Sequence, residues 1–257
     1  MKRKPVIFVT NDDGLHAPGL RKLIEIMRSL GTVIIVAPDK SQSGTAHGIT
    51  INVPLRLKTI VKEPGYEEYS CNGTPVDCVK LGFRVVLKGH PDMLVSGVNH
   101  GSNASINIIY SGTMAGVLEG AMAGIPSVGF SLLNYSHDAN LEPYAKYIKQ
   151  ISENVLNLGL PAGVCLNVNI PYASESAIQG IRICKQAGGT WQEDFDERVD
   201  PGGRKYYWLK GIFVKIDNAQ DTDEYALEHN FISIVPVQFD FTAQQAIPLL
   251  KKWPLNG

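Results

Sequence analysis

Two adjacent carboxylates, Asp12 and Asp13, follow a short apolar run near the start of the chain. The run 6–9 is rich in β-branched and aromatic side chains, which predicts a buried strand, and the Asn-Asp-Asp-Gly sequence after it predicts a turn. Adjacent anions repel each other, so a fold that holds them close shifts their pKa values or recruits a cation. We interpret the pair as ligands of a divalent metal; a plain turn is the competing interpretation.

Two further polar segments follow predicted strands. The loop after the strand at 32–37 contains Ser43 and Gly44, and the strand at 92–99 ends in Asn99. Because the carboxyl ends of parallel strands meet at one sheet edge, these side chains are expected near the carboxylates. Two carboxylates, a hydroxyl and an amide form an oxygen-only set that suits Mg²⁺ or Mn²⁺, with water completing the coordination. Taken singly, a solvated Ser43 and a turn-capping Asn99 are the plainer interpretations.

An anion site is predicted at the start of a helix over 114–123. Ser111, Gly112 and Thr113 precede this helix and offer hydroxyls and free backbone N–H groups, which bind anions at helix starts. A helix cap without a ligand is the competing interpretation. Asn11 and Gly44 belong to the same sheet edge and are predicted, with Ser111, Gly112 and Thr113, to bind the phosphate or the substrate. A metal beside an anion site indicates phosphate chemistry. The prediction depends on the convergence of these loops rather than on any one residue.

Alternating strands and helices predict the frame that positions these loops. Strand, helix and strand over 6–37 form a βαβ unit, for which parallel strands are expected. Further helices are predicted at 76–85, 114–123, 141–158, 222–229 and 243–253, and further strands at 49–57, 67–71, 92–99, 126–132, 163–170 and 231–241. This alternation favours an α/β fold with a mainly parallel sheet.

The character of the chain changes beyond about residue 180. The segment 191–209 carries five aromatic residues around a Pro-Gly-Gly turn at 201–203, which predicts a hairpin arm. An isolated hairpin is marginally stable, so we expect the arm to pack on something, another subunit included. We expect residues 1–257 to form a single α/β domain, with a core over about 1–180 and the arm and closing elements over about 181–257.

Composition narrows the class of protein. The chain has 257 residues, 44% of them hydrophobic, a net charge of −1 and no basic run that would suit a nucleic acid or an anionic membrane. Its four cysteines lack metal-ligand spacing and are expected as free thiols in a reducing cytoplasm. The stretch 114–133 is too interrupted to span a membrane, and the basic start precedes too short an apolar run for a signal peptide.

Four blocks, in order along the chain, resemble the SurE family of stationary-phase survival nucleotidases. They read VTNDDG from position 9, VAPDKSQSG from 36, NGTPVDCV from 72 and VSGVN from 95, the last followed by YSGT at 110–113. The aromatic stretch 197–208 is also similar to the family's. The resemblance covers nearly the whole chain, and the ordered set of blocks is highly specific.

This resemblance implies a three-layer Rossmann-like core with a C-terminal aromatic hairpin arm and helix. It implies a metal-dependent phosphomonoesterase that hydrolyses nucleoside 5′-monophosphates, with 3′-monophosphates left open. The implied ligands of one divalent metal per subunit are Asp12, Asp13, Ser43 and Asn99, and Asn103 joins the substrate-binding residues. The C-terminal arm would join subunits into homodimers or homotetramers. Two positions depart from the family's pattern: Gly48 stands where serine is expected, and Ser105 where glycine is expected.

Two routes to hydrolysis stay open. A metal-activated water is the favoured nucleophile, because a carboxylate on a metal attacks poorly; direct attack by Asp12, the predicted catalytic residue, is the alternative. The general acid is unassigned, with His16, His47 and His100 near the same edge. A nicotinamide dehydrogenase is disfavoured because G-x-G-x-x-G is missing after the first strand. A non-catalytic nucleotide- or metal-binding oligomeric module remains the alternative function.

Overall fold

The structure is a computed structural model that describes residues 3–136 and 138–255. Its strands are β1 (Val6–Thr10), β2 (Thr32–Pro38), β3 (Leu57–Glu63), β4 (Tyr66–Cys71), β5 (Met93–His100), β6 (Ser127–Leu132), β7 (Val164–Ile170), β8 (Gly180–Ile183), β9 (Gly189–Val199), β10 (Lys205–Lys215) and β11 (Phe231–Gln238). Nine of them form one sheet in the order β3-β4-β2-β1-β5-β6-β7-β11-β8. Only the β3–β4 and β7–β11 neighbours in this sheet are antiparallel. The predicted mainly parallel sheet is confirmed.

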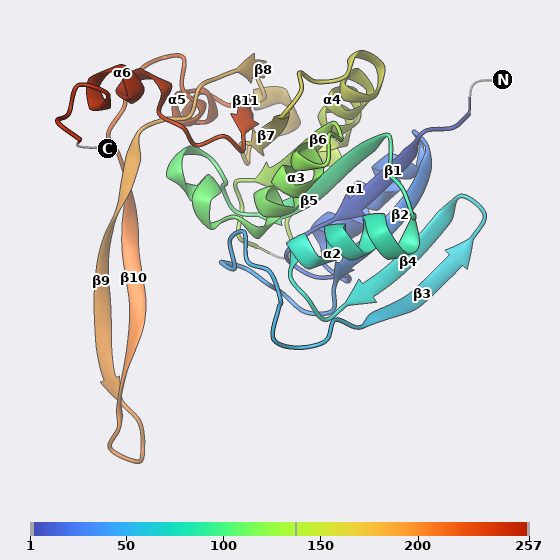
Figure 1. The fold of residues 1–257 in the computed structure, drawn as a ribbon, viewed down its shortest axis with the longest axis horizontal. Helices are drawn as coiled ribbons and strands as arrows, with labels where there is room; N and C mark the ends of the chain where they lie inside the picture. The colour runs from blue at the N-terminus through green and yellow to red at the C-terminus, as the bar shows by residue number, and fades with distance from the viewer. Residues whose placement is uncertain (1–2, 137, 256–257) are drawn as a thin grey trace.

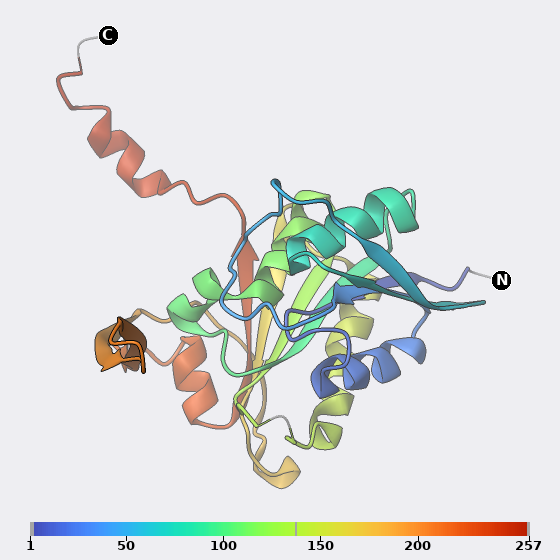
Figure 2. The ribbon, with the colours of Figure 1, turned by 90° about the horizontal axis from the view of Figure 1, so that it is seen from below.

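Helices cover both faces of the sheet. The α-helices of the chain are α1 (Pro18–Arg28), α2 (Pro75–Leu81), α3 (Gly112–Met122), α4 (Ala145–Leu158), α5 (Asp223–Glu228) and α6 (Ile247–Leu250). Figure 2 shows α2 and α3 on one face and α1 and α4 on the other, so the core has three layers. Successive residues of β1 serve these two faces, since Ile7 and Val9 join one apolar cluster and Phe8 joins the other. The Rossmann-like α/β architecture is therefore as predicted.

The start of α2 shows how the local sequence sets an element. Thr74 accepts a hydrogen bond from the Asp77 backbone N–H (3.2 Å), while the Asp77 carboxylate accepts one from the Thr74 N–H (2.9 Å). Pro75 occupies the first turn, where its missing N–H costs nothing. The predicted cap is confirmed, and it fixes the chain where it leaves β4.

The strand predicted over 49–57 is wrong. The chain is irregular there, and the hairpin partner of β4 across Pro64-Gly65 is β3, which begins at Leu57. Alternating apolar residues suggested a half-buried strand, yet Ile51 is 77% exposed. Asn72 instead holds the segment from the side, because it donates to the Pro54 carbonyl (3.3 Å) and accepts from the Arg56 N–H (2.7 Å).

The C-terminal part of the chain adds two strands, β8 and β11, to the sheet, and its other two strands form a separate hairpin. β11 inserts between β7 and β8, and β8 was not predicted. Strands β9 and β10 form the predicted hairpin arm, a long ribbon that projects from the body (Figure 1). The tail forms a short 3₁₀ turn and α6 rather than one helix over 243–253, and it extends away from the sheet (Figure 2). In the described part of the chain, no helix is both long and apolar enough to cross a membrane.

Candidate active site

The strand order reverses between β1 and β5, which are neighbours at the centre of the sheet. Ligands of open α/β sheets bind at the carboxyl ends of strands beside such a reversal. A cavity of about 490 Å³ opens there, a size suited to a small ligand. It is lined by Asp12, Ser43, Gly44, Asn99, His100, Ser102, Asn103, Asn107, Tyr110, Ser111, Tyr135, Trp191, Glu193, Leu209, Lys210 and Gly211.

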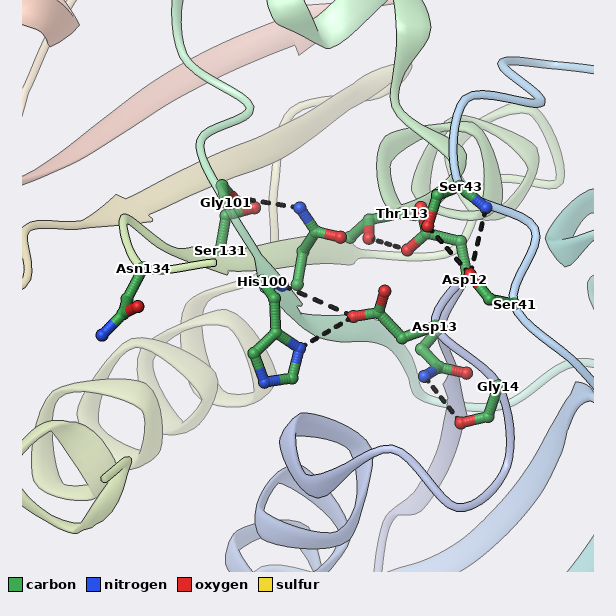
Figure 3. A network of polar contacts seen from close by, with 12 residues as sticks. Asp12, Asp13, Gly14, Ser41, Ser43, His100, Gly101, Thr113, Ser131 and Asn134 are labelled. Atoms are coloured by element: carbon green, nitrogen blue, oxygen red, sulfur yellow. Dashed lines mark hydrogen bonds and ion pairs between the residues drawn. The ribbon is translucent and has the colours of Figure 1, made fainter. Parts of the chain in front are cut away.

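Asp12 is the most deeply placed acidic group of the cavity. It is 4% exposed, and its Oδ1 accepts a short hydrogen bond from the Thr113 hydroxyl (Figure 3). Burial raises the pKa of Asp12 to about 6, with the Asp13 charge adding to the effect and the Thr113 hydrogen bond opposing it. Among the described residues Asp12 forms no ion pair. A buried carboxylate with only a neutral partner is a natural ligand for a cation.

Asp13 contacts His100 instead of lining the cavity. Its Oδ2 lies 3.1 Å from the His100 Nδ1 and accepts a longer bond from the His100 backbone N–H at 3.4 Å (Figure 3). This contact joins the loop after β1 to the end of β5. The preceding Asn11 donates its Nδ2 to the Gly14 carbonyl (3.0 Å), and its buried Oδ1 has no partner among the described residues.

The loop after β2 reaches the same edge, as predicted from the parallel pairing of β1 and β2. The Gln42 N–H donates to the Asp12 carbonyl (2.7 Å), which ties this loop to the first one. Ser43 lines the cavity with Gly44, and its hydroxyl lies 2.9 Å from that of Ser41. Ser43 is exposed, so its hydroxyl is available to a ligand.

Asn99 is positioned by an irregularity in β5. The pairing of β5 with β6 gains one residue between Ser96 and Asn99, as in a β-bulge. Gly97 allows this, because its φ is +123° and a Cβ would lie 2.3 Å from the Phe130 carbonyl oxygen. The Asn99 Nδ2 donates to the Gly101 carbonyl (3.0 Å), which leaves the amide oxygen as the group that Asn99 can offer to a ligand.

The start of α3 closes the floor of the cavity. Ser111 lines it and also caps the helix by accepting from the Met114 N–H (3.0 Å), so the cap interpretation is correct for this residue. Its hydroxyl hydrogen remains available for donation. Gly112 lies directly under Asp12, since a Cβ at Gly112 would stand 2.8 Å from that of Asp12. Thr113 is fully buried, and its hydroxyl donates to Asp12 instead of lining the cavity.

Asn103 lines the cavity from a loop held by buried amides of β7. Its backbone N–H donates to the Asn169 Oδ1 and its carbonyl accepts from the Asn167 Nδ2, both at 2.8 Å. The Asn169 Nδ2 donates to the Asn167 Oδ1 (3.0 Å), which closes a ring of hydrogen bonds. The Asn103 Nδ2 donates to the Ser131 hydroxyl (2.7 Å). The loop is therefore fixed from beneath, which the sequence pattern did not indicate.

The three histidines differ in position. His100 lines the cavity, whereas His16 and His47 do not. His47 instead lies 3.0 Å from the Glu119 carboxylate, which also accepts from Lys80 (2.7 Å). Only His100 of the three is placed to meet a ligand in this cavity.

The root of the hairpin arm is the part of the cavity that the sequence did not predict. Trp191 and Glu193 of β9 and Leu209 and Lys210 of β10 line it opposite the sheet loops. The aromatic content of the arm indicated packing against a partner. No spacing in the sequence relates position 191 to position 12, so the signal could not have been read from one chain.

A hard divalent cation fits the donors on this edge. The predicted set offers carboxylate, hydroxyl and amide oxygens, the ligands that Mg²⁺ and Mn²⁺ prefer. In residues 3–136 and 138–255 no three His, Cys, Asp or Glu side chains gather as a metal site, so a cation here would also depend on Ser43 and Asn99. The buried, unpaired charge of Asp12 is the observation that favours it.

The chain is similar to known proteins of one family. The sequence profile of "Survival protein SurE" matches residues 7–193. A relative from Christiangramia forsetii, named 5′-nucleotidase SurE, is 55% identical over 257 residues, 99% of each chain. A relative of the same name from Flavobacterium psychrophilum is 55% identical over 98% of this chain and 99% of its own. The crystal structure of the SurE protein from Aquifex aeolicus covers 96% of this chain and 98% of its own, with a TM-score of 0.83 and 36% identity.

Proposed function

The chain belongs to the SurE family, and from this premise we propose that it is a metal-dependent 5′-nucleotidase, a phosphoric monoester hydrolase that converts nucleoside 5′-monophosphates to nucleoside and phosphate. The shared name of its relatives, 5′-nucleotidase SurE, supports the substrate class. The observation that best supports metal-dependent hydrolysis is the Asp12 carboxylate, which is buried without an ion-pair partner among the described residues, at the floor of a cavity lined by oxygen donors. Action on 3′-monophosphates is a further part of the proposal.

Four side chains would hold the cation: Asp12, Asp13, Ser43 and Asn99. When bound, a divalent cation neutralises charge on the phosphoryl group and lowers the pKa of a coordinated water. The short bond from the Thr113 hydroxyl keeps the Asp12 carboxylate in one orientation. The contact between His100 and Asp13 does the same for the second carboxylate. The role of these residues is to present charge at a fixed point before substrate arrives.

The phosphate oxygens would be bound by donors on the cavity floor. Ser111, at the start of α3, offers its hydroxyl, and the N-terminus of this helix supplies positive partial charge. Gly44 lines the same cavity without a side chain and admits the phosphate close to its backbone. Asn103, fixed by the buried amides of β7, would contact the substrate beyond the phosphate. Asn11, Gly112 and Thr113 do not line the cavity. Gly112 and Thr113 contact Asp12, and Asn11 holds the turn after it by donating to the Gly14 carbonyl.

We also propose how the protein assembles and where it works. Residues 1–257 would act as a single domain whose arm and tail join it to copies of itself as a homodimer or homotetramer. Apolar side chains on the arm and tail support this, since Leu209 is 58% exposed, Phe241 88% and Trp253 61%. All four cysteines are unpaired, which supports a reducing, cytoplasmic location.

The test is phosphate release from a panel of nucleoside 5′- and 3′-monophosphates, with Mg²⁺, with Mn²⁺ and with EDTA. The proposal predicts release with a cation, none with EDTA, and recovery when the cation is restored in excess. Release that is unaffected by EDTA would contradict metal dependence. Folded protein that binds nucleotides but releases no phosphate under any condition would favour the non-catalytic binding module.

A further inference from the structure

We propose that the root of the hairpin arm is the nucleobase end of the active site, with the Trp191 indole as the surface on which the base stacks. The inference rests on the proposed function and deepens it, because it assigns the part of the substrate that the arm recognises. It starts from the observation that one cavity joins Asp12 to Trp191.

The two ends of this cavity differ in chemistry. The sheet end offers oxygen donors and a helix N-terminus, which suit a cation and a phosphate. The arm end offers the indole of Trp191, the side chain of Leu209, and one carboxylate and one ammonium group from Glu193 and Lys210. Lys210 also lies 3.7 Å from the Asp196 carboxylate, so the arm end carries no net positive charge and does not favour a second phosphate. Apolar surface with a donor and an acceptor suits a flat, hydrogen-bonding heterocycle.

Trp191 is held in place before any ligand binds. Its Nε1–H donates to the Asn107 Oδ1 at 2.9 Å. Its ring meets that of Phe213, its cross-strand partner, edge to face, with centroids 5.9 Å apart and planes at 65°. A side chain already fixed on two sides loses little conformational entropy when a base stacks on it. The other aromatic residues lining the cavity, Tyr110 and Tyr135, are 54% and 76% exposed.

The buried carboxylate of Asp223, at the start of α5, anchors the arm root to the sheet end. Its Oδ2 accepts from the Ser105 N–H (2.8 Å) and its Oδ1 from the Ala187 N–H (2.9 Å), so it joins the loop after β5, which carries Asn103, to the chain entering β9. Ser105 also donates its hydroxyl to the Ala187 carbonyl (2.9 Å).

Ser105 adopts a φ of +53°, the left-handed region that favours glycine, and these bonds hold it there. Gly189, the first residue of β9, packs closely against Ser105. A Cβ at Gly189 would lie only 2.8 Å from the Ser105 hydroxyl oxygen. Trp191 is two residues further on. The spacing between the two ends of the cavity is therefore set by direct contacts.

The experiment compares a nucleoside 5′-monophosphate with ribose 5-phosphate, which carries the same sugar phosphate without the base. In the wild-type protein we expect kcat/KM for the nucleotide to exceed that for ribose 5-phosphate by about 10- to 100-fold, the range that base–aromatic stacking supplies. Trp191→Ala should remove most of this advantage through KM and leave ribose 5-phosphate hydrolysis within about threefold. Trp191→Phe should restore most of it.

Trp208→Ala is the matched control. Trp208 is a tryptophan of the same arm, 60% exposed and outside the residues that line the cavity. If the arm joins subunits, both variants change the amount of active assembly, but the ratio of the two kcat/KM values cancels that effect. Only Trp191→Ala should change the ratio.

Two results would overturn the proposal: equal kcat/KM for the two substrates in the wild-type protein, or an unchanged ratio in Trp191→Ala. The proposed function fails in a different way, as absence of phosphate release from either substrate. Equilibrium dialysis with labelled adenosine 5′-monophosphate then decides the subsite without turnover. Weaker binding to Trp191→Ala than to Trp208→Ala supports it, and equal binding of the two variants contradicts it.

Discussion

The two ends of the active-site cavity are built by different means. The sheet end consists of residues near the carboxyl ends of β1, β2 and β5 and at the start of α3, and its most buried carboxylate, Asp12, is 4% exposed. The arm end consists of a hairpin that projects from the body and whose residues are mostly exposed (Figure 1). The sheet end depends on local sequence and a parallel core, whereas the arm end depends on packing between distant segments.

Under the proposed function, this difference would separate catalysis at the sheet end from base recognition at the arm. A group that must present charge at one point benefits from a rigid, buried support, and the central strands of the sheet provide it. A group that selects among substrates can sit on a more exposed element, provided that something fixes its root. Here Asp223 provides that link, because it binds the loop of the sheet end and the chain entering the arm.

The largest effect should follow from removing the charge at the sheet end. Asp12→Asn should lower kcat/KM by on the order of 1,000-fold or more, since the cation loses its most buried ligand. Stability in EDTA should not fall, because the variant relieves the burial of a charge. Steady-state kinetics and thermal unfolding measure both. The exposed Asp39, just after β2, provides the control Asp39→Asn, expected within about threefold of wild type. Turnover by Asp12→Asn at saturating metal would contradict the assignment.

The second-largest effect should follow from changing Asp223, the residue that links the two ends. Asp223→Ala leaves the buried N–H groups of Ser105 and Ala187 and the partly buried N–H of Glu224 without their acceptor, and we expect a loss of about 3 kcal/mol in the free energy of unfolding. Denaturant titration measures this loss. If the variant folds, the nucleotide should lose more kcat/KM than ribose 5-phosphate, because the arm root loses this anchor while Asn103 keeps its bonds to Asn167 and Asn169. Equal losses would mean that Asp223 does not couple the ends.

Within the sheet end, removing the Ser43 hydroxyl should affect activity more than removing the neighbouring Ser41 hydroxyl. Ser43 lines the cavity and Ser41 does not, although their oxygens lie 2.9 Å apart. Ser43→Ala should lower kcat/KM about 10-fold and raise the metal concentration needed for half-maximal activity, as expected on loss of one weak ligand. Ser41→Ala should change either quantity less than threefold. The reverse order would place the ligand at Ser41.

The smallest effect concerns α5, which carries Asp223 and supports the arm root. Burial raises the pKa of Glu224 from its usual value near 4.5 to about 7, and the charges of Asp223 and Glu228 add to the effect while Lys215 opposes it. The folded state therefore holds the proton more tightly, so the stabilisation is present at pH 4.5 and is lost as the pH rises through about 7.

Glu224→Gln should reduce this pH dependence by no more than about 1 kcal/mol, once screening by solvent is considered. Urea titrations at pH 5 and pH 8 measure it. The free energy of unfolding of the variant should exceed that of the wild type only at pH 8. A gain of equal size at both pH values would show that the carboxyl group is not the cause.

The sequence could predict what local patterns encode. The run before Asp12, the cap at Thr74 and the helix start at Ser111 each combine a strand or helix signal with a terminating residue, and all three were found. The prediction of a strand over 49–57 failed because alternation alone cannot distinguish a half-buried strand from an irregular surface segment held by Asn72. The ring of amides beneath Asn103 joins positions more than sixty residues apart, and the position of Trp191 depends on similar long-range contacts. Such contacts leave no periodic signal in one sequence.

The most direct test is a crystal structure of the protein with Mn²⁺ and a non-hydrolysable nucleoside 5′-phosphonate. We expect one cation on the oxygens of Asp12, Asp13, Ser43 and Asn99, the phosphonate over the start of α3, and the base stacked on Trp191. A cation held by other residues, or a base directed away from the arm root with the phosphonate in place, would contradict it.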